Sequence, residues 1–198
     1  MSEKQQNPSH PYTGGQYHLK KTIVMVGMMG AGKTAVGRAL AHRIDVPFLD
    51  SDAEIEAAAS RTVHEIFERD GEPFFRSKET QVISRLLETE RCVLSTGGGA
   101  FLAQENRQNI SDSGVSVWLN ADLDLLWQRV RHKDTRPLLR TADPRATLAE
   151  ICAARVPLYA LADVAVTSLP DLTIDEMVNR VIAALVANRP DVLEQVDA

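Results

Sequence analysis

Cysteine is scarce in this chain, which has only Cys92 and Cys152 among its 198 residues. The two lie far apart in the sequence and form no Cys-x-x-Cys pair, so neither a disulfide framework nor a zinc site is indicated. Each lies in an apolar context, where a free cysteine is most often packed inside the protein. We therefore expect both to be core residues.

Long apolar runs are also missing, since no stretch approaches the ~20 apolar residues of a membrane span. The first segment, MSEKQQNPSHPYTGGQYHLK, has neither the apolar core of a signal peptide nor the arginine-rich character of a transit peptide. Its polar composition, with proline and glycine, predicts a disordered tail over residues 1–20. We expect a cytoplasmic protein without a membrane partner.

The chain lacks an excess of positive charge as well. Its formal net charge of −5 argues against nucleic acid as a partner. Apolar residues make up 44% and charged residues 25% of the chain, as in an ordinary globular domain with a sizeable core. The length suits one domain, for which we expect small-molecule substrates and a monomeric state.

Short apolar runs alternate with helical patterns along the chain. Five runs predict buried strands: KTIVMVG (21–27), VPFLD (46–50), RCVLS (91–95), VSVWLN (115–120) and VAVTS (164–168). Helical patterns follow from residue 34 and over 51–70, 72–90, 122–131 and 174–185. Ser51 and Glu54 fit a capping box at the second of these helices. The alternation predicts an α/β fold with a parallel sheet covered on both faces.

Residues 132–145, HKDTRPLLRTADPR, break this alternation because they are polar, basic and interrupted by two prolines. Such a segment is typical of a functional loop rather than a core element. We expect it to be a mobile lid that is open or poorly ordered without ligands. The end of the chain, residues 188–198, predicts a loose tail, which leaves residues 21–187 as the folded domain.

Residues 27–34, GMMGAGKT, match the phosphate-binding pattern G-x-x-x-x-G-K-[ST] between a predicted strand and a predicted helix. The glycines let backbone N–H groups turn toward phosphate oxygens, and the helix N-terminus favours negative charge. Lys33 supplies a catalytic positive charge for the β and γ phosphates, and Thr34 a hydroxyl for Mg²⁺. We therefore predict that ATP, with Mg²⁺, binds at Gly30, Ala31, Gly32, Lys33, Thr34 and Ala35.

A dinucleotide site is the alternative for this segment. GAGKTA (30–35) also fits G-x-G-x-x-A, and Asp50 ends a predicted strand at the distance where a ribose-binding acid belongs. That alternative gives no role to Lys33 or Thr34. The chain is also short for two mononucleotide-binding halves and a substrate domain, so binding of a nucleoside triphosphate is favoured.

Two acids, Asp50 and Asp52 in FLDSD, end the second predicted strand, where the ligand crevice of an open α/β sheet lies. Beside a phosphate loop, one can hold Mg²⁺ through water and the other can take or orient an acceptor hydroxyl. The alternative is that both only favour a helix N-terminus electrostatically. A calcium loop is excluded because Ile55 stands where that loop needs glycine.

At this point the sequence resembles the shikimate kinase family over roughly residues 20–187. The resemblance rests on an ordered set of motifs: GMMGAGKT, FLDSD, GEPFFRSKE (71–79), STGGGA (95–100), TRPLL (135–139) and ARVPLY (154–159). It implies a three-layer, nucleoside-monophosphate-kinase-like P-loop fold with a five-stranded parallel sheet and a lid. It also implies transfer of the γ-phosphoryl group of ATP to the 3-hydroxyl of shikimate, in aromatic amino-acid synthesis.

The resemblance implies roles for several charged residues toward the acceptor. Asp52 contacts the shikimate hydroxyls and is assigned to catalysis, while Arg76 and Arg155 hold the carboxylate. The planar guanidinium group pairs bidentately with carboxylate oxygens, which agrees with that assignment. The alternative for each arginine is a solvated surface position. Glu79 is expected to steady Arg76 rather than to catalyse.

On the ATP side, the same resemblance places Asp50 near the metal and Arg129 against the adenine. Arg136 reaches the transferring phosphate from the lid, and we assign it to catalysis and to ATP binding. A mobile arginine that closes over the phosphates stabilises charge and excludes water. The alternative for Arg136 is an ordinary basic loop.

A second glycine run, STGGGAF (95–101), lacks the G-K-[ST] ending of the first and follows the third predicted strand. We predict that Gly97, Gly98 and Gly99 let the main chain approach the acceptor and offer it N–H donors. A tight strand-to-helix turn would explain one or two of these glycines. Two functional alternatives also stay open: a kinase for another small hydroxy-acid such as gluconate, and a nucleotide-binding module without catalysis.

Overall fold

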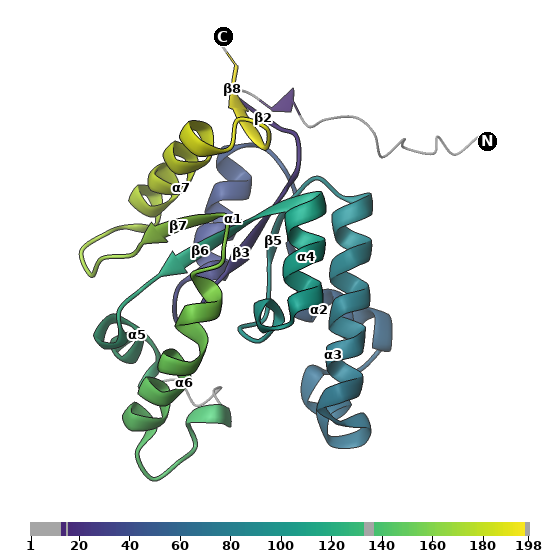
Figure 1. Cartoon of the computed structure of the whole chain (residues 1–198), viewed down its shortest axis with the longest axis vertical. Helices are drawn as coiled ribbons and strands as arrows, with labels where there is room; N and C mark the ends of the chain where they lie inside the picture. Colours follow the sequence, from purple (N-terminus) through teal and green to yellow (C-terminus); the bar gives the residue numbers. More distant parts are fainter. Residues whose placement is uncertain (1–12, 15, 133–136, 197–198) are drawn as a thin grey trace, which may run out of the picture.

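The computed structural model describes residues 13–14, 16–132 and 137–196 of the chain. Its centre is a five-stranded sheet in the order β4-β5-β3-β6-β7 (Figure 1). Every neighbouring pair in it is parallel, which confirms the predicted parallel sheet. The strands are β3 (Thr22–Val26), β4 (Phe48–Asp50), β5 (Val93–Ser95), β6 (Gly114–Asn120) and β7 (Val164–Thr167).

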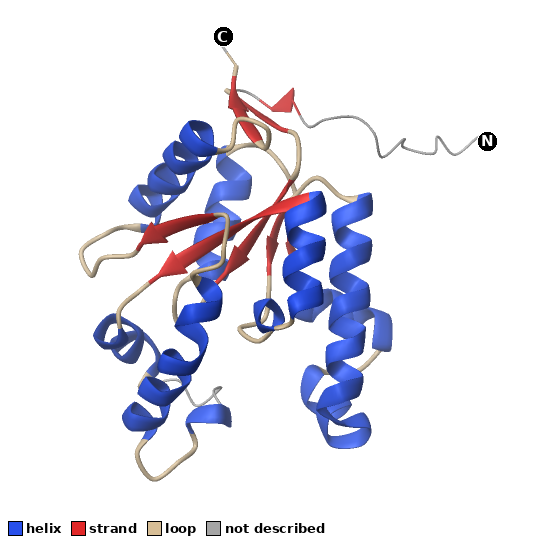
Figure 2. Ribbon diagram, in the orientation of Figure 1, coloured by secondary structure: helices blue, strands red, loops and turns tan. Residues whose placement is uncertain are grey.

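Helices cover both faces of this sheet, as predicted for a three-layer fold. One layer contains α1 (Lys33–Arg43) and α7 (Ile174–Asn188), which pack together. The other contains α3 (Val63–Thr89) and α4 (Gln104–Ser113). Figure 2 shows the strands as one layer between these helices. Within the described ranges, no helix combines the length and the apolar character needed to cross a membrane.

The central strand β3 is buried along its whole length, which explains why its sequence is an uninterrupted apolar run rather than an alternating one. Ser95 of β5 lies opposite Met25 of β3 and also opposite Asp50 of β4. The carboxyl ends of these three strands are therefore level with one another. The residues that follow each strand meet at one edge of the sheet.

The start of α2 (Ser51–Ala59) differs from the predicted capping box. Asp50, not Ser51, is the N-cap residue, and its carboxylate accepts hydrogen bonds from the N–H groups of Asp52 and Ala53 at 3.0 and 3.4 Å. Ser51 is instead buried, and its hydroxyl accepts a hydrogen bond from the N–H of Gly97. The predicted helix over 51–70 is also interrupted, because Ser60 adopts a left-handed conformation before α3 begins.

Parts of both predicted tails are folded. Strands β1 (Thr13–Gly14), β2 (Tyr17–Leu19) and β8 (Leu193–Gln195) form a second, antiparallel sheet. Leu19 and Leu193 are fully buried, and an ion pair of 2.8 Å joins Lys20 to Glu194. The expected disorder is therefore wrong for 17–20 and for 193–195. Residues 1–12 and 197–198 lie outside the described part.

The region around the predicted lid contains more regular structure than the sequence indicated. After α5 (Leu123–Val130) come the short helix η2 (Pro137–Leu139) and α6 (Pro144–Tyr159), so the lid range 132–145 overlaps both of these last two elements. Pro144 can begin α6 because an N–H group in the first turn has no partner within the helix, so proline loses no hydrogen bond there. The Asp143 carboxylate accepts a hydrogen bond from the Ala146 N–H at 3.0 Å. Residues 133–136 lie outside the described part, so the lid's mobility stays a prediction.

Candidate active site

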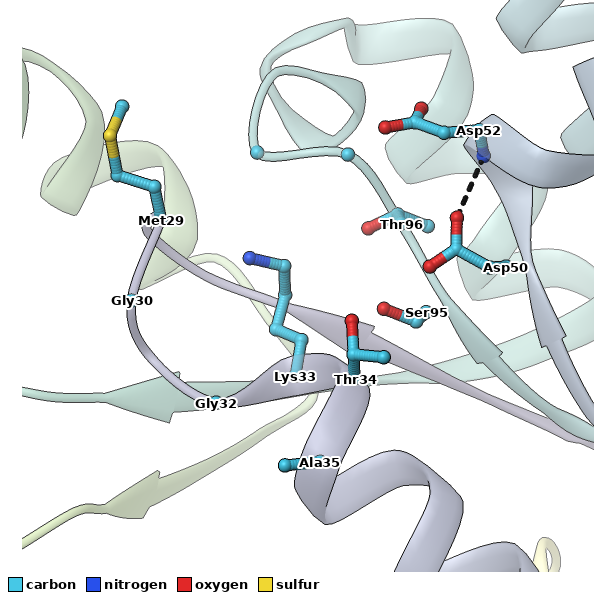
Figure 3. Close-up of a pocket in the computed structure, with 12 residues that line it drawn as sticks. Met29, Gly30, Gly32, Lys33, Thr34, Ala35, Asp50, Asp52, Ser95 and Thr96 are labelled. Carbon is cyan, nitrogen blue, oxygen red and sulfur yellow. Dashed lines mark hydrogen bonds between the residues drawn. The ribbon is translucent and has the colours of Figure 1, made fainter. Parts of the chain in front are cut away.

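A cavity of about 300 Å³ opens where the strand ends meet. Figure 3 shows that three segments surround it: the phosphate loop, the end of β4 and the glycine run after β5. Its lining residues are Met29, Gly30, Gly32, Lys33, Thr34, Ala35, Asp50, Asp52, Ser95, Thr96, Gly97 and Gly98. The structure therefore brings together most of the residues that the sequence assigned to ATP, metal and acceptor.

The phosphate loop has the backbone that its glycines permit. Gly27, Gly30 and Gly32 have φ values of 137°, 80° and 97°, which side-chain-bearing residues rarely adopt. The ammonium group of Lys33 donates hydrogen bonds of 2.9 and 3.0 Å to the carbonyl oxygens of Gly27 and Met28. Lys33 is thus held across its own loop, at the place where phosphate oxygens would take over as acceptors.

Arg129 contacts the phosphate loop, and neither Arg129 nor the loop residue Ala31 is among the described residues that line the cavity. The Arg129 guanidinium donates to the carbonyl oxygens of Gly30 and Ala31, each at 3.3 Å, and to the Ser168 hydroxyl at 3.3 Å. Burial lowers the pKa of this guanidinium. The Ala31 side chain is buried, so only its main chain can serve ATP. Ser168, which the sequence left without a role, thus lies beside Arg129.

Thr34 and Asp50 offer oxygen ligands to a metal ion. One oxygen of Asp50 is used by the N-terminus of α2, and the other points toward Thr34 and Ser95 (Figure 3). Over the described ranges no three acidic, histidine or cysteine side chains cluster as a metal cage. Mg²⁺ fits this sparse set, because it is usually held by few protein oxygens together with water and substrate phosphates.

Asp52 lies in a poorly solvated position beside the second glycine run. Burial raises the pKa of its carboxyl, Asp50 and Glu56 raise it further, and the positive charges of Arg76 and Lys33 oppose the rise. Its Oδ1 atom is buried and has no hydrogen-bond partner in the described part of the chain. This oxygen lies 3.1 Å from where a β-carbon on Gly97 would be. An acceptor hydroxyl would satisfy it.

Arg76 is fixed by acids of its own helix and by the glycine run. Its guanidinium donates to Glu79 at 2.7 Å and to Glu72 at 3.3 Å. Glu79 is only 1% exposed, and burial raises the pKa of its carboxyl although Arg76 opposes the rise. The ion pair agrees with the steadying role expected for Glu79. A β-carbon on Gly99 would lie 2.5 Å from Nη2 of Arg76, so glycine leaves room for this side chain.

Arg155 approaches the same glycine run from α6. Its Nη1 atom lies 3.6 Å from where a β-carbon on Gly98 would be. One turn further along α6, the hydroxyl of Tyr159 donates a hydrogen bond to the Gly98 carbonyl. Tyr159 lies in the motif ARVPLY but has no role among the predicted site residues; its spacing of four from Arg155 is the sequence signal that the two share a helix face. Arg136 lies outside the described residues, so its assignment stays a prediction.

Comparison with known protein families gives a consistent result. The family model for shikimate kinase matches residues 29–186. A shikimate kinase from Ruegeria pomeroyi is 67% identical over 98% of this chain and 99% of its own length. One from Cereibacter sphaeroides is 67% identical over 89% of this chain and 87% of its own.

Solved structures agree with the sequence relatives. Shikimate kinase from Acinetobacter baumannii in complex with shikimate is 36% identical, with a TM-score of 0.78 over 85% of this chain and 94% of that chain. The enzyme from Bacteroides thetaiotaomicron is 34% identical, with a TM-score of 0.77 over 83% of this chain and 98% of that chain. A gluconokinase from Sinorhizobium meliloti, 18% identical with a TM-score of 0.54, shares the fold alone.

Proposed function

The chain belongs to the shikimate kinase family, and from this premise we propose how its residues transfer the γ-phosphoryl group of ATP to the 3-hydroxyl of shikimate. The products are shikimate 3-phosphate and ADP, on the route to chorismate and the aromatic amino acids. One observation carries the proposal: a single cavity joins the phosphate loop to Asp52 and to the main chain of Gly97 and Gly98. Donor and acceptor can therefore meet in one space.

The ATP side of the cavity consists of the phosphate loop and the start of α1. The N–H groups of residues 30–35 and the helix N-terminus hold the phosphates. Lys33, already held across the loop by two carbonyl oxygens, exchanges them for phosphate oxygens when ATP binds. Arg129 lies beside Ser168 on the outer side of the loop, and these two residues contact the adenine part of ATP.

The acceptor side consists of Asp52, two arginines and the glycine run. Arg76 and Arg155 lie against Gly99 and Gly98 respectively, so two guanidinium groups flank the same short stretch of main chain. Shikimate is a carboxylate with several hydroxyl groups, and its carboxylate pairs with these guanidinium groups. Its ring hydroxyls then reach the Asp52 carboxylate and the main-chain N–H groups.

In the transfer step, the 3-hydroxyl oxygen forms a bond to the γ-phosphorus while the bond from that phosphorus to the ADP oxygen breaks. Asp52 accepts the hydrogen bond of the attacking hydroxyl and orients it. Because the pKa of Asp52 is raised by burial, its carboxylate is a better proton acceptor than an exposed aspartate. The charges of Lys33 and Arg136 stabilise the phosphoryl group during transfer.

Thr34, with its hydroxyl, and Asp50, with a carboxylate oxygen, would hold Mg²⁺ when ATP is bound. The ion would supply positive charge against the phosphate oxygens. The described residues of this single chain supply both an ATP side and an acceptor side to the cavity, and we therefore propose that a monomer is active. We propose a cytoplasmic location, where ATP is supplied.

The function is tested by ADP release from purified protein with ATP and Mg²⁺, with shikimate and gluconate assayed side by side. Shikimate-dependent turnover is expected, with little from gluconate. Turnover with gluconate alone would identify a different hydroxy-acid kinase. ATP binding without turnover of either acceptor would identify a nucleotide-binding module.

Lys33→Met is expected to lower kcat by about 10³-fold or more, because the loss removes a charge that acts in the transition state. Lys21→Met is the matched control, since Lys21 pairs with Asp191, away from the cavity.

Arg155→Ala is expected to weaken shikimate binding and to spare ATP binding. Arg145→Ala is the control on the same helix: Arg145 pairs with the exposed Asp124, and its loss is expected to change neither. An effect of Arg155→Ala on ATP alone would refute the acceptor assignment.

A further inference from the structure

Tyr159 is the last residue of α6 and has no exposed surface. Its ring stacks near two other aromatic rings, with centroid distances of 6.4 Å to Trp118 and 6.5 Å to Phe101. Its hydroxyl donates a hydrogen bond to the Gly98 carbonyl. The ring packing fixes the direction of the hydroxyl, so the hydrogen bond is held from the protein interior.

The bonded carbonyl belongs to the peptide group that also contains the N–H of Gly99. In the described part of the chain, the N–H groups of Gly98 and Gly99 donate to no protein acceptor. A hydrogen bond accepted by a carbonyl polarises its peptide group and makes the N–H of that group a stronger donor. The Tyr159 hydroxyl therefore strengthens an N–H donor in the residue that follows the cavity-lining Gly98.

The same hydroxyl also connects two parts of the acceptor site. Arg155 lies one helical turn before Tyr159, so both side chains leave the same face of α6. Arg155 and Tyr159 then meet Gly98 on its α-carbon and on its carbonyl, respectively. The hydrogen bond from Tyr159 to Gly98 joins the end of α6 to the glycine run. It therefore also sets the position of Arg155 relative to that run.

We propose that Tyr159 is a positioning residue for shikimate: its hydroxyl orients and polarises the Gly98–Gly99 peptide and sets the distance between that peptide and Arg155. This inference rests on the proposed function, since it assigns the glycine run and Arg155 to the acceptor. The inference goes beyond the proposed function by naming a buried residue that does not touch the substrate. A purely structural tyrosine would need only its ring, which phenylalanine supplies equally well.

Tyr159→Phe removes the hydroxyl and keeps the ring. The loss of one hydrogen bond to a ligand-binding peptide is expected to raise the KM for shikimate by about five- to tenfold. The KM for ATP is expected to stay within about twofold, because the hydrogen bond of the Tyr159 hydroxyl goes to Gly98, outside the phosphate loop. In ¹⁵N-labelled protein, the amide resonance of Gly99 is expected to shift to a position typical of a less polarised peptide.

Two further variants complete the test. Tyr17→Phe removes a hydroxyl from β2 in the second sheet and is expected to change neither KM nor the Gly99 resonance. Para-aminophenylalanine incorporated at position 159 restores a donor on the same ring and is expected to return the shikimate KM toward that of the unaltered protein. This rescue also serves if the phenylalanine variant is too unstable for kinetics.

An unchanged shikimate KM and an unchanged Gly99 resonance in Tyr159→Phe would overturn the inference. A parallel rise of both KM values with a lower unfolding temperature would overturn it too, since it would show a structural role only. Absence of shikimate turnover in the unaltered protein would instead refute the proposed function. The two failures are therefore distinguishable.

Discussion

The two glycine-rich segments at the cavity use glycine for different physical reasons. In the phosphate loop, Gly27, Gly30 and Gly32 have positive φ values, so the backbone conformation itself requires glycine. In the second run, 97–99, no glycine has a positive φ. There charged side chains lie next to each α-carbon: Asp52 at Gly97, Arg155 at Gly98 and Arg76 at Gly99.

Under the proposed function, one residue type serves two substrates in different ways. The phosphate loop would recognise ATP through the shape of its main chain, which presents N–H groups to phosphate oxygens. The second run leaves room for the carboxylate and guanidinium groups that we propose recognise shikimate. Adding a methyl group to the first segment should therefore disturb the backbone, whereas adding one at Gly97 or Gly99 in the second should displace a side chain.

Gly30→Ala is expected to have the largest effect. Gly30 has a φ of 80°, and its new β-carbon would lie 2.6 Å from Cγ1 of Val130. The left-handed conformation alone costs roughly 1–2 kcal/mol for an L-residue, and relief of the clash moves the loop away from the phosphates. We expect a lower unfolding temperature and a KM for ATP raised by about 100-fold or more, as measured by thermal unfolding and initial rates.

Gly32→Ala is the matched control within the loop. Gly32 has a φ of 97°, but among the described residues a β-carbon there would meet no atom closer than 3.8 Å. Its loss of stability should therefore be smaller than that of Gly30→Ala. Equal losses would show that the clash with Val130 is unimportant.

Gly99→Ala is expected to have the next largest effect, on the other substrate. The φ of Gly99 is −93°, which alanine adopts without strain. The β-carbon would lie within 2.5 to 2.8 Å of three guanidinium atoms of Arg76, so that side chain must move. We expect the KM for shikimate to rise by about 10- to 50-fold, as for loss of a charged hydrogen bond, and stability to fall because the buried Glu79 loses its partner. A rise in the ATP KM alone would contradict the comparison.

Asp52→Asn is expected to have the smallest effect on stability, and its sign is informative. The pKa of Asp52 in the folded protein is raised above the ordinary value of 3.8, chiefly by burial. Ionisation therefore disfavours the folded state, and stability is lost as the pH rises from 3.8 through the raised pKa. Asparagine removes this loss, so the variant should unfold at a higher temperature than the unaltered protein at neutral pH and lose that advantage at about pH 3.5.

Thermal unfolding at both pH values checks this prediction, with Asp171→Asn, an exposed position, as the control. Asp52→Asn should also have a strongly lowered kcat while ATP still binds. A variant less stable than the unaltered protein at neutral pH would show that the Asp52 charge is satisfied in the free protein.

The sequence predicts the central sheet and most of the cavity because both depend on local patterns. Buried strands such as β3 are continuous apolar runs, and the phosphate loop has a fixed spacing. Strands β2 and β8 have no such pattern, and their pairing joins Tyr17 to Gln195 across the whole chain. Helix α6 is not predicted because Pro144 in its first turn and Pro157 near its end interrupt the helical sequence pattern.

The candidate site shows the same division. Lys33, Asp50 and Asp52 lie in recognisable sequence motifs, and the structure places them together at the cavity. The N-cap role of Asp50 could not be predicted from the sequence, because Asp and Ser are about equally good N-cap residues. Only the structure shows that Ser51 is buried and bonded to Gly97 instead. The contact of Tyr159 with Gly98 depends on how α6 packs against the sheet, which no local pattern encodes.

Gly98→Ala tests the central claim most directly. Its β-carbon would lie 3.6 Å from Nη1 of Arg155 and 3.9 Å from Gly27 and Met29, which are ordinary contacts, so the variant should fold. The methyl group would stand between the acceptor and the main chain that is proposed to bind it. Initial rates with each substrate varied should show a shikimate KM raised by about tenfold and an ATP KM within about twofold. A raised ATP KM with an unchanged shikimate KM would contradict the account, because the second glycine run would then serve the nucleotide.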